Sequence, residues 1–526
     1  MSVDLESLAT IGGGRVIGDE TVTVSSCSLD SKAIAAGGLF AALPGTRVHG
    51  AQFAGGTEAA AILTDEAGLQ HLQEAGERRP IIVVEDIRAV LGLIAAEIYE
   101  HPTKSLTVIA VTGTSGKTTT SYLLEAGLLH AGYKVGLIGT TGTRINRTPV
   151  PTKLTTPEAP TLQELFARML AEGVTHVVME VSSHALELGR VRGTHFKVGG
   201  FSNLSQDHLD FHPTMEDYFE AKAALFDGPQ SAASAVICVD DEWGKRMLER
   251  AAGKPRTVVA TTAAEQAQQL ADAVDATLVT ATQTGTEVTG EQHVDMNFAG
   301  QQHSFELPMP GRFNIANAAL ATGMAAAVGV DVEQFLAGIE RVAVPGRMER
   351  IDRGQEFVAV VDYAHKPAAV AAVLDTLRGQ LEGTDGRLAV VVGAGGDRDS
   401  SKRPLMGAAA AERADLVVVT DDNPRSEDPA TIRASVIEGA RKASASTDIR
   451  EVGSRAAAID EAVRWAMPGD AVIVVGKGHE VGQIIGDETV HFDDREELAR
   501  ALDEKLAGNA PQENARYGDT VEKEQA

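Results

Sequence analysis

Residues 105–119, SLTVIAVTGTSGKTT, constrain the fold most, because an apolar run leads directly into a glycine-containing loop. Residues 121–132, SYLLEAGLLHAG, follow with helical spacing and a final glycine, so the predicted order is strand, loop and helix. Backbone N–H groups of such a loop cradle phosphates together with the start of the helix. Lys117 would then supply charge to the terminal phosphates, and the Thr118 hydroxyl would ligate Mg²⁺. The alternative is an ordinary glycine turn with a helix cap.

The same pattern of short apolar runs separated by helical patterns recurs along the chain. These runs are 175–183, 198–205, 233–241, 356–365, 387–396, 415–423 and 470–478. The alternation predicts an α/β fold with doubly wound, mainly parallel sheets. Since 526 residues are too many for one core, we expect three domains and a tail. Their predicted bounds are 1–102 for a smaller N-terminal α/β domain, 103–344 for a central domain around the phosphate loop, 345–507 for a C-terminal domain, and 508–526 for a disordered tail.

Composition narrows the class of partner. Lys and Arg total 47 against 74 Asp and Glu, which gives a net charge of −27, and aromatic residues make up only 4%. This balance disfavours a nucleic acid or an anionic membrane as a partner. Cys27 and Cys238 give no disulfide framework and favour a reducing compartment. The first residues show no secretory signal and no apolar run approaches the ~20 residues of a membrane span, so we expect a cytoplasmic protein.

Three motifs of the middle segment place polar groups next to apolar runs. Glu180 follows the apolar residues of the run 175–183. It is either a carboxylate that holds Mg²⁺ or a basic substrate, or a solvated acid at the end of a strand. Residues 201–212, FSNLSQDHLDFH, lack the spacing of a zinc site, so a metal site and a polar loop both stay open. Lys222 lies among apolar residues of a helical stretch. It either extends its charge to water or has a lowered pKa and takes up CO₂ as a carbamate that binds Mg²⁺.

Four polar residues further along have two interpretations each. Asn314 and Asn317 start a helical pattern, where they either cap the helix or meet the edge of a nucleotide base. Arg347 lies at the expected domain joint as an exposed arginine or a phosphate contact. Asp362 follows an apolar run and is either a ligand-binding group or a surface acid.

Residues 421–425, DDNPR, end an apolar run with more charge than a turn requires, because Asn, Asp and Pro already suffice for a turn. Two glycine loops, GAGGDRD at 393–399 and GKGHE at 476–480, follow other apolar runs. In parallel sheets, ligands bind outside the carboxyl ends of the strands. We therefore expect one pocket for a zwitterion, although each loop taken singly is also an ordinary turn. Its expected residues are Arg398, Arg425, Asp422, Asn423 and Glu480.

Ten segments in order resemble the Mur ligase family of peptidoglycan synthesis, over about residues 24–505. They are GTSGKTT, MEVSSHAL, SNLSQDHLDFH, YFEAKAALF, GRFNIANA, PGRME, DYAHKP, GGDRD, DDNPR and GKGHE. The resemblance implies an N-terminal domain for the UDP end of a substrate, a central ATPase and a Rossmann-like domain for an amino acid. It also implies an ATP-dependent amide ligase that adds meso-2,6-diaminopimelate to UDP-N-acetylmuramoyl-L-alanyl-D-glutamate.

The resemblance further implies the residues of each contact. For ATP they are Gly113, Thr114, Ser115, Gly116, Lys117, Thr118, Thr119, Asn317, Arg347 and Asp362. For the UDP-muramoyl-dipeptide they are Leu29, Ser31, Thr46, Arg47, Val48, Thr155, Thr156, Ser182 and Arg190. For diaminopimelate they are Arg398, Asp422, Asn423, Pro424, Arg425, Gly476 and Glu480. Two Mg²⁺ ions would be held by Thr118 and Glu180, and by His208 and carbamylated Lys222, and the implied catalytic residues are Lys117, Glu180, His208 and Lys222.

The implied reaction begins when the D-glutamate carboxylate attacks the γ-phosphate of ATP to give an acyl phosphate, which the amine then attacks. Lys117 and two Mg²⁺ would neutralise the repelling anions, and domain closure would exclude water. The far end of diaminopimelate is a zwitterion, whose carboxylate suits Arg398 and Arg425. Lysine lacks that carboxylate, so we expect discrimination against it. We expect the enzyme to be a monomer.

Three other functions compete with this one. A related amide ligase such as folylpolyglutamate synthetase is disfavoured by DNPR and by LDSK at 29–32. A phosphate-loop kinase or nucleotide-switched binding module would release phosphate without regard to an added amino acid. A non-catalytic scaffold has no use for so many polar loops at strand ends.

Overall fold

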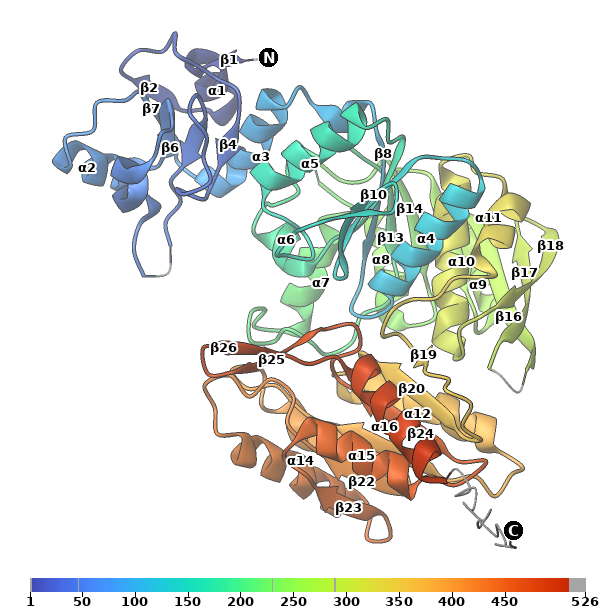
Figure 1. The fold of residues 1–526 in the computed structure, drawn as a ribbon. Helices are drawn as coiled ribbons and strands as arrows, with labels where there is room; N and C mark the ends of the chain where they lie inside the picture. The colour runs from blue at the N-terminus through green and yellow to red at the C-terminus, as the bar shows by residue number, and fades with distance from the viewer. Residues whose placement is uncertain (1, 46, 229, 288–289, 510–526) are drawn as a thin grey trace, which may run out of the picture. The chain divides into compact units, whose positions relative to one another are not determined.

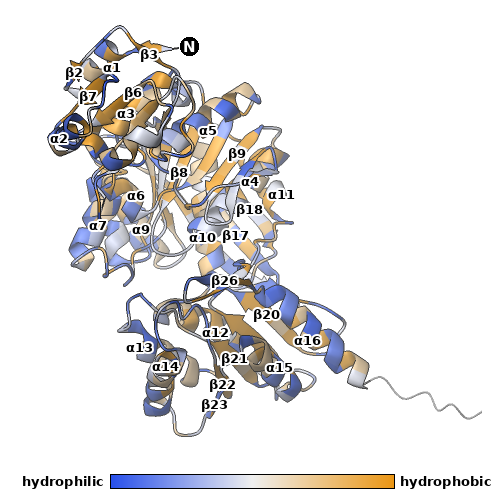
Figure 2. Ribbon diagram, turned by 60° about the vertical axis from the view of Figure 1, so that its left-hand side comes forward, coloured by the Kyte–Doolittle hydropathy of each residue, from blue (hydrophilic) through white to orange (hydrophobic). Residues whose placement is uncertain are grey.

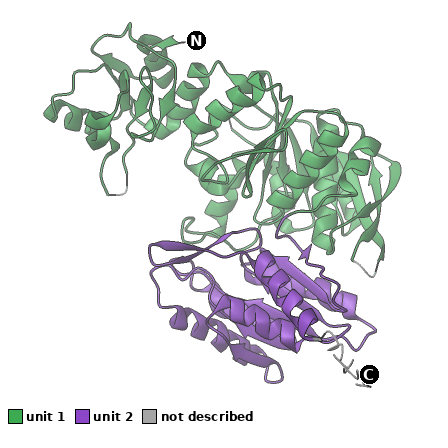
Figure 3. Ribbon diagram, in the orientation of Figure 1, with its two compact units in different colours: residues 1–344 green, residues 345–526 purple. Residues whose placement is uncertain are grey.

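The computed structural model describes residues 2–45, 47–228, 230–287 and 290–509 (Figure 1). The chain divides into two compact units, residues 1–344 and residues 345–526 (Figure 3). Unit 1 contains a five-stranded N-terminal sheet and an eleven-stranded central sheet, and unit 2 contains a six-stranded sheet.

The N-terminal part of unit 1 is a small α/β layer. Its elements are β1 (Val3–Asp4), α1 (Leu5–Gly12), β2 (Arg15–Ile17), β3 (Thr23–Val24), β4 (Cys27–Ser28), β5 (Leu39–Ala41), η1 (Gly50–Gly56), β6 (Ala61–Thr64), α2 (Glu66–Glu74), β7 (Ile81–Val83), α3 (Ile87–Ile98) and η2 (Pro102–Lys104). The sheet order is β2-β7-β6-β5-β4, and β4, β5, β6 and β7 pair in parallel. The segments that follow β4 and β5 therefore start at the same edge of this sheet.

The central part of unit 1 is a large, mainly parallel sheet. Its elements are β8 (Thr107–Thr112), α4 (Lys117–His130), β9 (Val135–Gly139), β10 (Gly142–Ile145), β11 (Thr148–Val150), α5 (Ala159–Ala171), β12 (His176–Glu180), α6 (Ser183–Glu187), β13 (Phe196–Phe201), α7 (Met215–Ala223), β14 (Ser234–Cys238), α8 (Glu242–Arg250), β15 (Arg256–Ala260), α9 (Ala264–Val274), β16 (Thr277–Thr286), β17 (Gln292–Phe298), β18 (Gln301–Leu307), α10 (Arg312–Ala327) and α11 (Val332–Ile339). The strand order is β11-β10-β9-β12-β8-β13-β14-β15-β16-β17-β18. In this order, the seven strands from β9 across to β16 pair in parallel. At the two ends of this parallel part, β10 pairs antiparallel with β9, and β17 pairs antiparallel with β16.

The four central residues of strand β8 are apolar because both faces of the strand are covered. Val108 and Ala110 belong to one buried cluster, whereas Ile109 and Val111 belong to the other. Since successive side chains of a strand point to opposite faces and helices cover both faces, every position from Val108 to Thr112 is buried. Strands β8 and β9 are accordingly hydrophobic in Figure 2.

Unit 2 repeats this arrangement around one sheet. Its elements are β19 (Glu349–Arg350), β20 (Val358–Asp362), α12 (Pro367–Leu381), β21 (Leu388–Val392), α13 (Lys402–Ala411), β22 (Leu416–Val419), α14 (Pro429–Ala443), β23 (Asp448–Glu451), α15 (Arg455–Trp465), β24 (Ala471–Val475), β25 (Gly482–Ile485), β26 (Glu488–His491) and α16 (Asp494–Asn509). The order is β19-β20-β24-β21-β22-β23, with all pairs parallel except β19–β20. The loops after β20, β24, β21 and β22 therefore emerge at one edge.

The predicted α/β class, with a parallel-rich central sheet and a separate C-terminal sheet, is confirmed. The predicted tail begins too early, because α16 continues to Asn509, and residues 510–526 lie outside the described residues. Cys27 and Cys238 are both free and buried. Within the described ranges, no helix combines the length and the apolar character that crossing a bilayer requires.

Candidate functional site

The phosphate loop of unit 1, residues 113–116, joins β8 to α4 and requires glycine at two positions. Gly113 has a φ of 144°, and a Cβ there would lie 2.0 Å from the Ser202 hydroxyl oxygen. Gly116 has a φ of 87°, and its Cβ would lie 2.2 Å from Oδ1 of Asn317. Both values lie in the left-handed region that favours glycine. The loop therefore packs closely against the segment after β13 on one side and against α10 on the other.

Two ammonium groups converge on one carbonyl of this loop. Nζ of Lys117 donates to the Gly113 oxygen at 2.9 Å and to the Thr114 oxygen at 3.1 Å. Nζ of Lys222, on α7, donates to the same Gly113 oxygen at 2.9 Å. Lys222 is 1% exposed, and its ammonium lies 4.5 Å from the centroid of the Tyr218 ring. Lys222 thus does not extend to water, and the fold brings it to the phosphate loop.

Glu180 is buried at the carboxyl end of β12, which pairs with β8. Its carboxylate oxygens accept hydrogen bonds from the Thr140 N–H at 2.9 Å and the Thr140 hydroxyl at 2.8 Å. Its backbone oxygen accepts from the Thr156 hydroxyl at 2.8 Å, and the Thr155 hydroxyl lies 3.3 Å from that of Thr140. Ser182 caps α6 with its hydroxyl oxygen. These predicted residues form one polar group beside the phosphate loop.

The donor set suits Mg²⁺ in part. The buried Thr118 hydroxyl and the Glu180 carboxylate are the oxygen donors that this cation prefers. Nε2 of His208 lies 3.1 Å from Oδ2 of Asp207, and the histidine side chain is 43% exposed. Within the described residues, no three His, Cys, Asp or Glu side chains come together as a metal site. A Mg²⁺ ion held by Thr118 and Glu180 would therefore need further ligands, such as nucleotide phosphates and water.

Two further predicted residues are held by polar neighbours. Nε of Arg190 pairs with Oε1 of Glu158 at 2.9 Å. Nδ2 of Asn317 donates to Oδ1 of Asn314 at 3.1 Å, and Asn314 itself donates to a backbone carbonyl before the helix at 2.7 Å. Within the described part of the chain, no side chain caps the start of α10, so the interpretation of these asparagines as caps is wrong. Asn317 instead packs against Gly116 of the phosphate loop.

The predicted contacts for the UDP end lie on the N-terminal sheet. Leu29 and Ser31 follow β4, and Arg47 and Val48 lie on the loop after the parallel neighbour β5. Arg47 and Val48 are exposed, while Leu29 and Ser31 are half-buried. Thr46 lies outside the described residues.

In unit 2, the loops after β22 and β24 meet at the sheet edge. Nδ2 of Asn423 donates to Oε2 of Glu480 at 3.3 Å, and Oδ1 of Asn423 accepts from Nζ of Lys477 at 2.8 Å. The Lys477 ammonium also lies 3.4 Å from Oδ1 of Asp422. The Tyr363 hydroxyl, after β20, donates to Oε1 of Glu480 at 3.2 Å. The three acidic and amide residues predicted for an ammonium group therefore lie in one cluster.

The two carboxylates of this cluster have pKa values displaced in opposite directions. Burial opposes ionisation of Asp422, but the charges of Arg455 and Lys477 outweigh it and hold the pKa of Asp422 below its usual value. Burial and the neighbouring Asp422 charge raise the pKa of Glu480. Oδ1 of Asp422 is buried without a hydrogen-bond partner in the described part of the chain. A cationic ligand group would stabilise both carboxylates as anions.

Arg425 lies beside this cluster in a left-handed conformation with a φ of 52°. Its N–H donates to the Ile484 oxygen at 3.1 Å, and Nη1 donates to the Gly396 oxygen at 2.7 Å. The preceding Pro424 is buried. Arg398 is exposed on the loop after β21, and its guanidinium donates to the neighbouring Asp397 carbonyl at 3.5 Å. Arg425 is therefore hydrogen-bonded to the loop that carries Arg398. The hydrogen bond of Arg398 itself goes to its own loop and not to the cluster.

Asp362, at the end of β20, is not a surface acid. Its oxygens accept hydrogen bonds from the Met348 N–H and the Ala364 N–H, both at 2.7 Å. Burial raises its pKa, and the Arg347 charge opposes that shift. The Arg347 guanidinium lies over the Tyr363 ring, 4.4 Å from its centroid. Arg347 and Asp362, the two predicted nucleotide contacts of unit 2, therefore both lie at the carboxyl end of β20.

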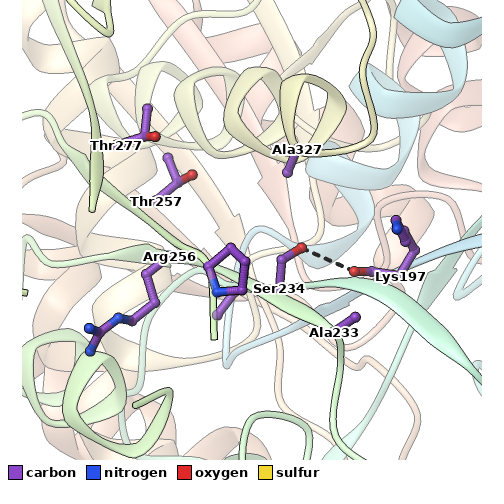
Figure 4. A pocket seen from close by; sticks show the side chains of 9 residues that line it. Lys197, Ala233, Ser234, Arg256, Thr257, Thr277 and Ala327 are labelled. Carbon is purple, nitrogen blue, oxygen red and sulfur yellow. Dashed lines mark hydrogen bonds between the residues drawn. The ribbon is translucent and has the colours of Figure 1, made fainter. Parts of the chain in front are cut away.

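Two cavities of unit 1 lie away from the phosphate loop. One of about 270 Å³ is lined by Lys197, Ser234, Arg256 and Thr277 (Figure 4). These residues belong to the beginnings of β13, β14, β15 and β16, whereas the phosphate loop follows the end of β8. A second cavity of about 730 Å³ shares Lys197 with the first. Among the described residues, none of those predicted for the site lines either cavity.

Sequence reasoning missed two buried cations of unit 2, Lys477 and Arg455. Both have a side-chain exposure of 0%. Lys477 lies inside the GKGHE segment, between two glycines and directly after an apolar run, and that position was the available signal. Arg455 begins an Ala-rich helix, and nothing in that pattern marks it.

Three protein-family models match the chain. They are described as Mur ligase family, catalytic domain, over residues 23–99; Mur ligase middle domain, over residues 111–325; and Mur ligase, glutamate ligase domain, over residues 346–478. Together they span most of the described chain.

Curated relatives and solved structures agree with these matches. A Corynebacterium glutamicum protein named UDP-N-acetylmuramoyl-L-alanyl-D-glutamate--2,6-diaminopimelate ligase is 59% identical over 508 residues, which cover 94% of this chain and 95% of the relative. A Streptomyces coelicolor protein of the same name is 46% identical, over 92% of this chain and 93% of the relative. A solved structure with that enzyme's name has a TM-score of 0.66 and 30% identity over 96% of this chain and 100% of its own. Folylpolyglutamate synthase of Mycobacterium tuberculosis shares the fold alone, with a TM-score of 0.56 and 19% identity over 80% of this chain and 95% of its own.

Proposed function

Because the chain belongs to the Mur ligase family, we infer that it is an ATP-dependent ligase of peptidoglycan precursor synthesis. It joins meso-2,6-diaminopimelate to UDP-N-acetylmuramoyl-L-alanyl-D-glutamate, the reaction for which its relatives are named. The structural observation that carries the choice of amino acid is the cluster at the edge of unit 2. There Asn423 contacts Glu480 at 3.3 Å, and Arg425 is tied to the neighbouring loop at 2.7 Å.

Amide formation needs an activated carboxyl group. The D-glutamate carboxylate attacks the γ-phosphate of ATP, ADP leaves, and the acyl phosphate is then attacked by the diaminopimelate amine with loss of phosphate. N–H groups of residues 113–119 and the Lys117 ammonium would stabilise the transferring phosphoryl group. Since Lys117 donates to two carbonyls of its own loop, nucleotide binding replaces those hydrogen bonds.

We propose that Thr118 and Glu180 hold one Mg²⁺, and that His208 and carbamylated Lys222 contribute to a second. When bound, the ions supply positive charge where two anions must meet. Lys222 can take this role only as a carbamate, because an ammonium group has no lone pair for a cation. Its burial beside the phosphate loop supports this proposal.

Substrate binding is proposed to follow the three expected domains, with bounds of 1–102, 103–344 and 345–507. Leu29, Ser31, Thr46, Arg47 and Val48 would contact the UDP end, and Thr155, Thr156, Ser182 and Arg190 the muramoyl-dipeptide. Arg398 and Arg425 would bind the far carboxylate of diaminopimelate, and Asp422, Asn423 and Glu480 its ammonium, with Pro424 and Gly476 shaping the loops. Asn317, Arg347 and Asp362 would contact ATP. We place the monomeric enzyme in the cytoplasm, which its two free thiols support.

Phosphate release from ATP tests this function. We expect it only when UDP-muramoyl-dipeptide and diaminopimelate are both present, and far less with lysine in place of diaminopimelate. Release that ignores the amino acid would indicate a nucleotide-switched module. Release that needs glutamate and a folate would indicate a folylpolyglutamate synthetase.

A further inference from the structure

A fully buried ion pair lies behind the carboxylate cluster of unit 2. Arg455 is the first residue of α15 and Asp494 is the first residue of α16. Nε and Nη2 of Arg455 donate to the two carboxylate oxygens of Asp494, each at 2.7 Å, and both side chains are 0% exposed. Removing both charges from water costs more than their attraction returns unless further polar partners exist. The remaining contacts of the guanidinium therefore determine whether the buried pair is stabilised.

The other partners of Arg455 are the two loops of the proposed amino-acid site. Nη2 donates to the oxygen of Val475, the last residue of β24, at 2.9 Å. Nη1 donates to the oxygen of Asp421, after β22, at 3.5 Å. A Cβ on Gly476 would lie 3.0 Å from Oδ2 of Asp422 and 3.7 Å from Nη2 of Arg455. One guanidinium thus joins the starts of two helices to the ends of two strands, directly beside the Asp422 carboxylate.

Lys477 is the second buried cation of this region. Its Nζ donates to Oδ1 of Asn423 and to the Gly482 oxygen, both at 2.8 Å, and forms the ion pair with Asp422 at 3.4 Å. Because the side chain is 0% exposed, a ligand does not reach this ammonium. Lys477 acts on a ligand only through the amide and the carboxylate that it holds.

The formal charges of the side chains around Asp422 indicate which charge a bound ligand group would carry. Arg455 and Lys477 carry two positive charges, and Asp494 and Asp422 carry two negative charges. Glu480 adds a third negative charge when it is ionised, and its pKa is raised by burial and by Asp422. One ligand ammonium group balances that last charge.

We propose that Arg455 and Lys477 are positioning residues for the ammonium end of the amino-acid substrate. Arg455, supported by Asp494, fixes the ends of β22 and β24, and Lys477 orients Asn423 and Asp422 so that both face the same point as Glu480. This inference rests on the proposed function, because the ammonium belongs to the diaminopimelate assigned there.

Three variants test the role. Arg455→Met combined with Asp494→Leu removes both buried charges while keeping apolar volume, which often preserves stability. Lys477→Met and the conservative Arg455→Lys are made separately. The matched control is Arg387→Met, because Arg387 forms a 2.7 Å ion pair with Asp470 at the amino-terminal edge of the same sheet.

The measurements are thermal unfolding, KM for diaminopimelate and for ATP, and the pH profile of kcat/KM for diaminopimelate. For the first two variants we expect KM for diaminopimelate to rise about 10- to 100-fold, as for the loss of about one charge-assisted hydrogen bond, and KM for ATP to stay within about twofold. Arg455→Lys should recover part of the loss, and Arg387→Met should leave both constants unchanged.

The pH profile separates positioning from a purely structural role. The charged groups that face Asp422 are Arg455, Lys477, His365 and Glu480. Removing a cation from this set raises the pKa of the remaining carboxylates, so the acid limb of the profile should move to higher pH. Folded variants with unchanged KM for diaminopimelate, or with equal losses for ATP, would overturn the inference. If the double variant does not fold, Lys477→Met and Arg455→Lys decide the outcome. Wild-type enzyme that turns over without diaminopimelate would instead refute the proposed function, before any variant is made.

Discussion

Arg425→Ala should weaken the use of diaminopimelate far more than the use of ATP. Arg425 already adopts a φ of 52°, and alanine also has a Cβ, so the substitution adds no backbone strain. The Gly396 oxygen loses a donor at 2.7 Å, which costs about 1 kcal/mol of unfolding free energy. The variant should therefore remain folded, and its kinetic defect should reflect the lost guanidinium.

The size of that defect follows from the contact proposed for the far carboxylate. A charge-assisted hydrogen bond contributes about 1.5–3 kcal/mol, and a half-buried guanidinium that makes one or two of them contributes about 2–4 kcal/mol. At 1.4 kcal/mol per tenfold, KM for diaminopimelate should rise about 30- to 800-fold. Lysine has no far carboxylate, so its KM should change little, and the preference for diaminopimelate should shrink by the same factor.

Phosphate release under varied concentrations of each substrate measures these constants. Arg413→Ala is the matched control, because Arg413 pairs with Asp375 at 2.8 Å before β22 and away from the loops. Equal losses for ATP and diaminopimelate, or an unchanged ratio of diaminopimelate to lysine, would show that Arg425 does not read the far carboxylate.

Three further results are expected. Lys117→Ala should lower kcat at least about 100-fold with little change in thermal unfolding, and a variant with near-normal kcat would contradict its role at the phosphates. As pH falls through the raised pKa of Glu480, KM for diaminopimelate should rise because the protonated acid no longer attracts an ammonium group; Glu480→Gln should have a high KM that does not vary with pH in this range. The hydrogen bond from Arg79 lowers the pKa of Glu77 to about 2. Its contribution to stability is thus complete above the ordinary value of 4.5 and is lost as pH falls towards 2, and acid unfolding of Glu77→Gln should lack that dependence.

The strand-and-loop order could be read from the sequence because it depends on local signals. The apolar run before Gly113 and the helical spacing after Lys117 specify β8, the loop and α4 with no knowledge of the rest of the chain. The meeting of Asn423 with Glu480 follows from one additional rule, since all strands of a parallel sheet end at the same edge and only β21 separates β22 from β24.

Other features depend on partners far away in sequence, which no local pattern specifies. Arg455 is buried against Asp494, which lies 39 residues later, and an arginine at the start of an Ala-rich helix otherwise resembles a surface residue. Asn314 and Asn317 have the residue type and position of helix caps, yet they bond to each other and pack towards Gly116. Arg398, grouped with Arg425 by sequence, is exposed on the loop after β21, and no local pattern distinguishes an exposed arginine of such a loop from one that is held by it.

The shared oxygen of Gly113 has a consequence for the order of events at the phosphate loop. Lys117 and Lys222 both donate to it, so an arriving nucleotide meets ammonium groups that are already engaged and must compete for them. Entry of the nucleotide is an exchange of bonds rather than a simple addition. Conversion of the Lys222 ammonium to a carbamate would remove its positive charge and leave it a single N–H, so Lys117 would remain as the ammonium group that the triphosphate has to detach.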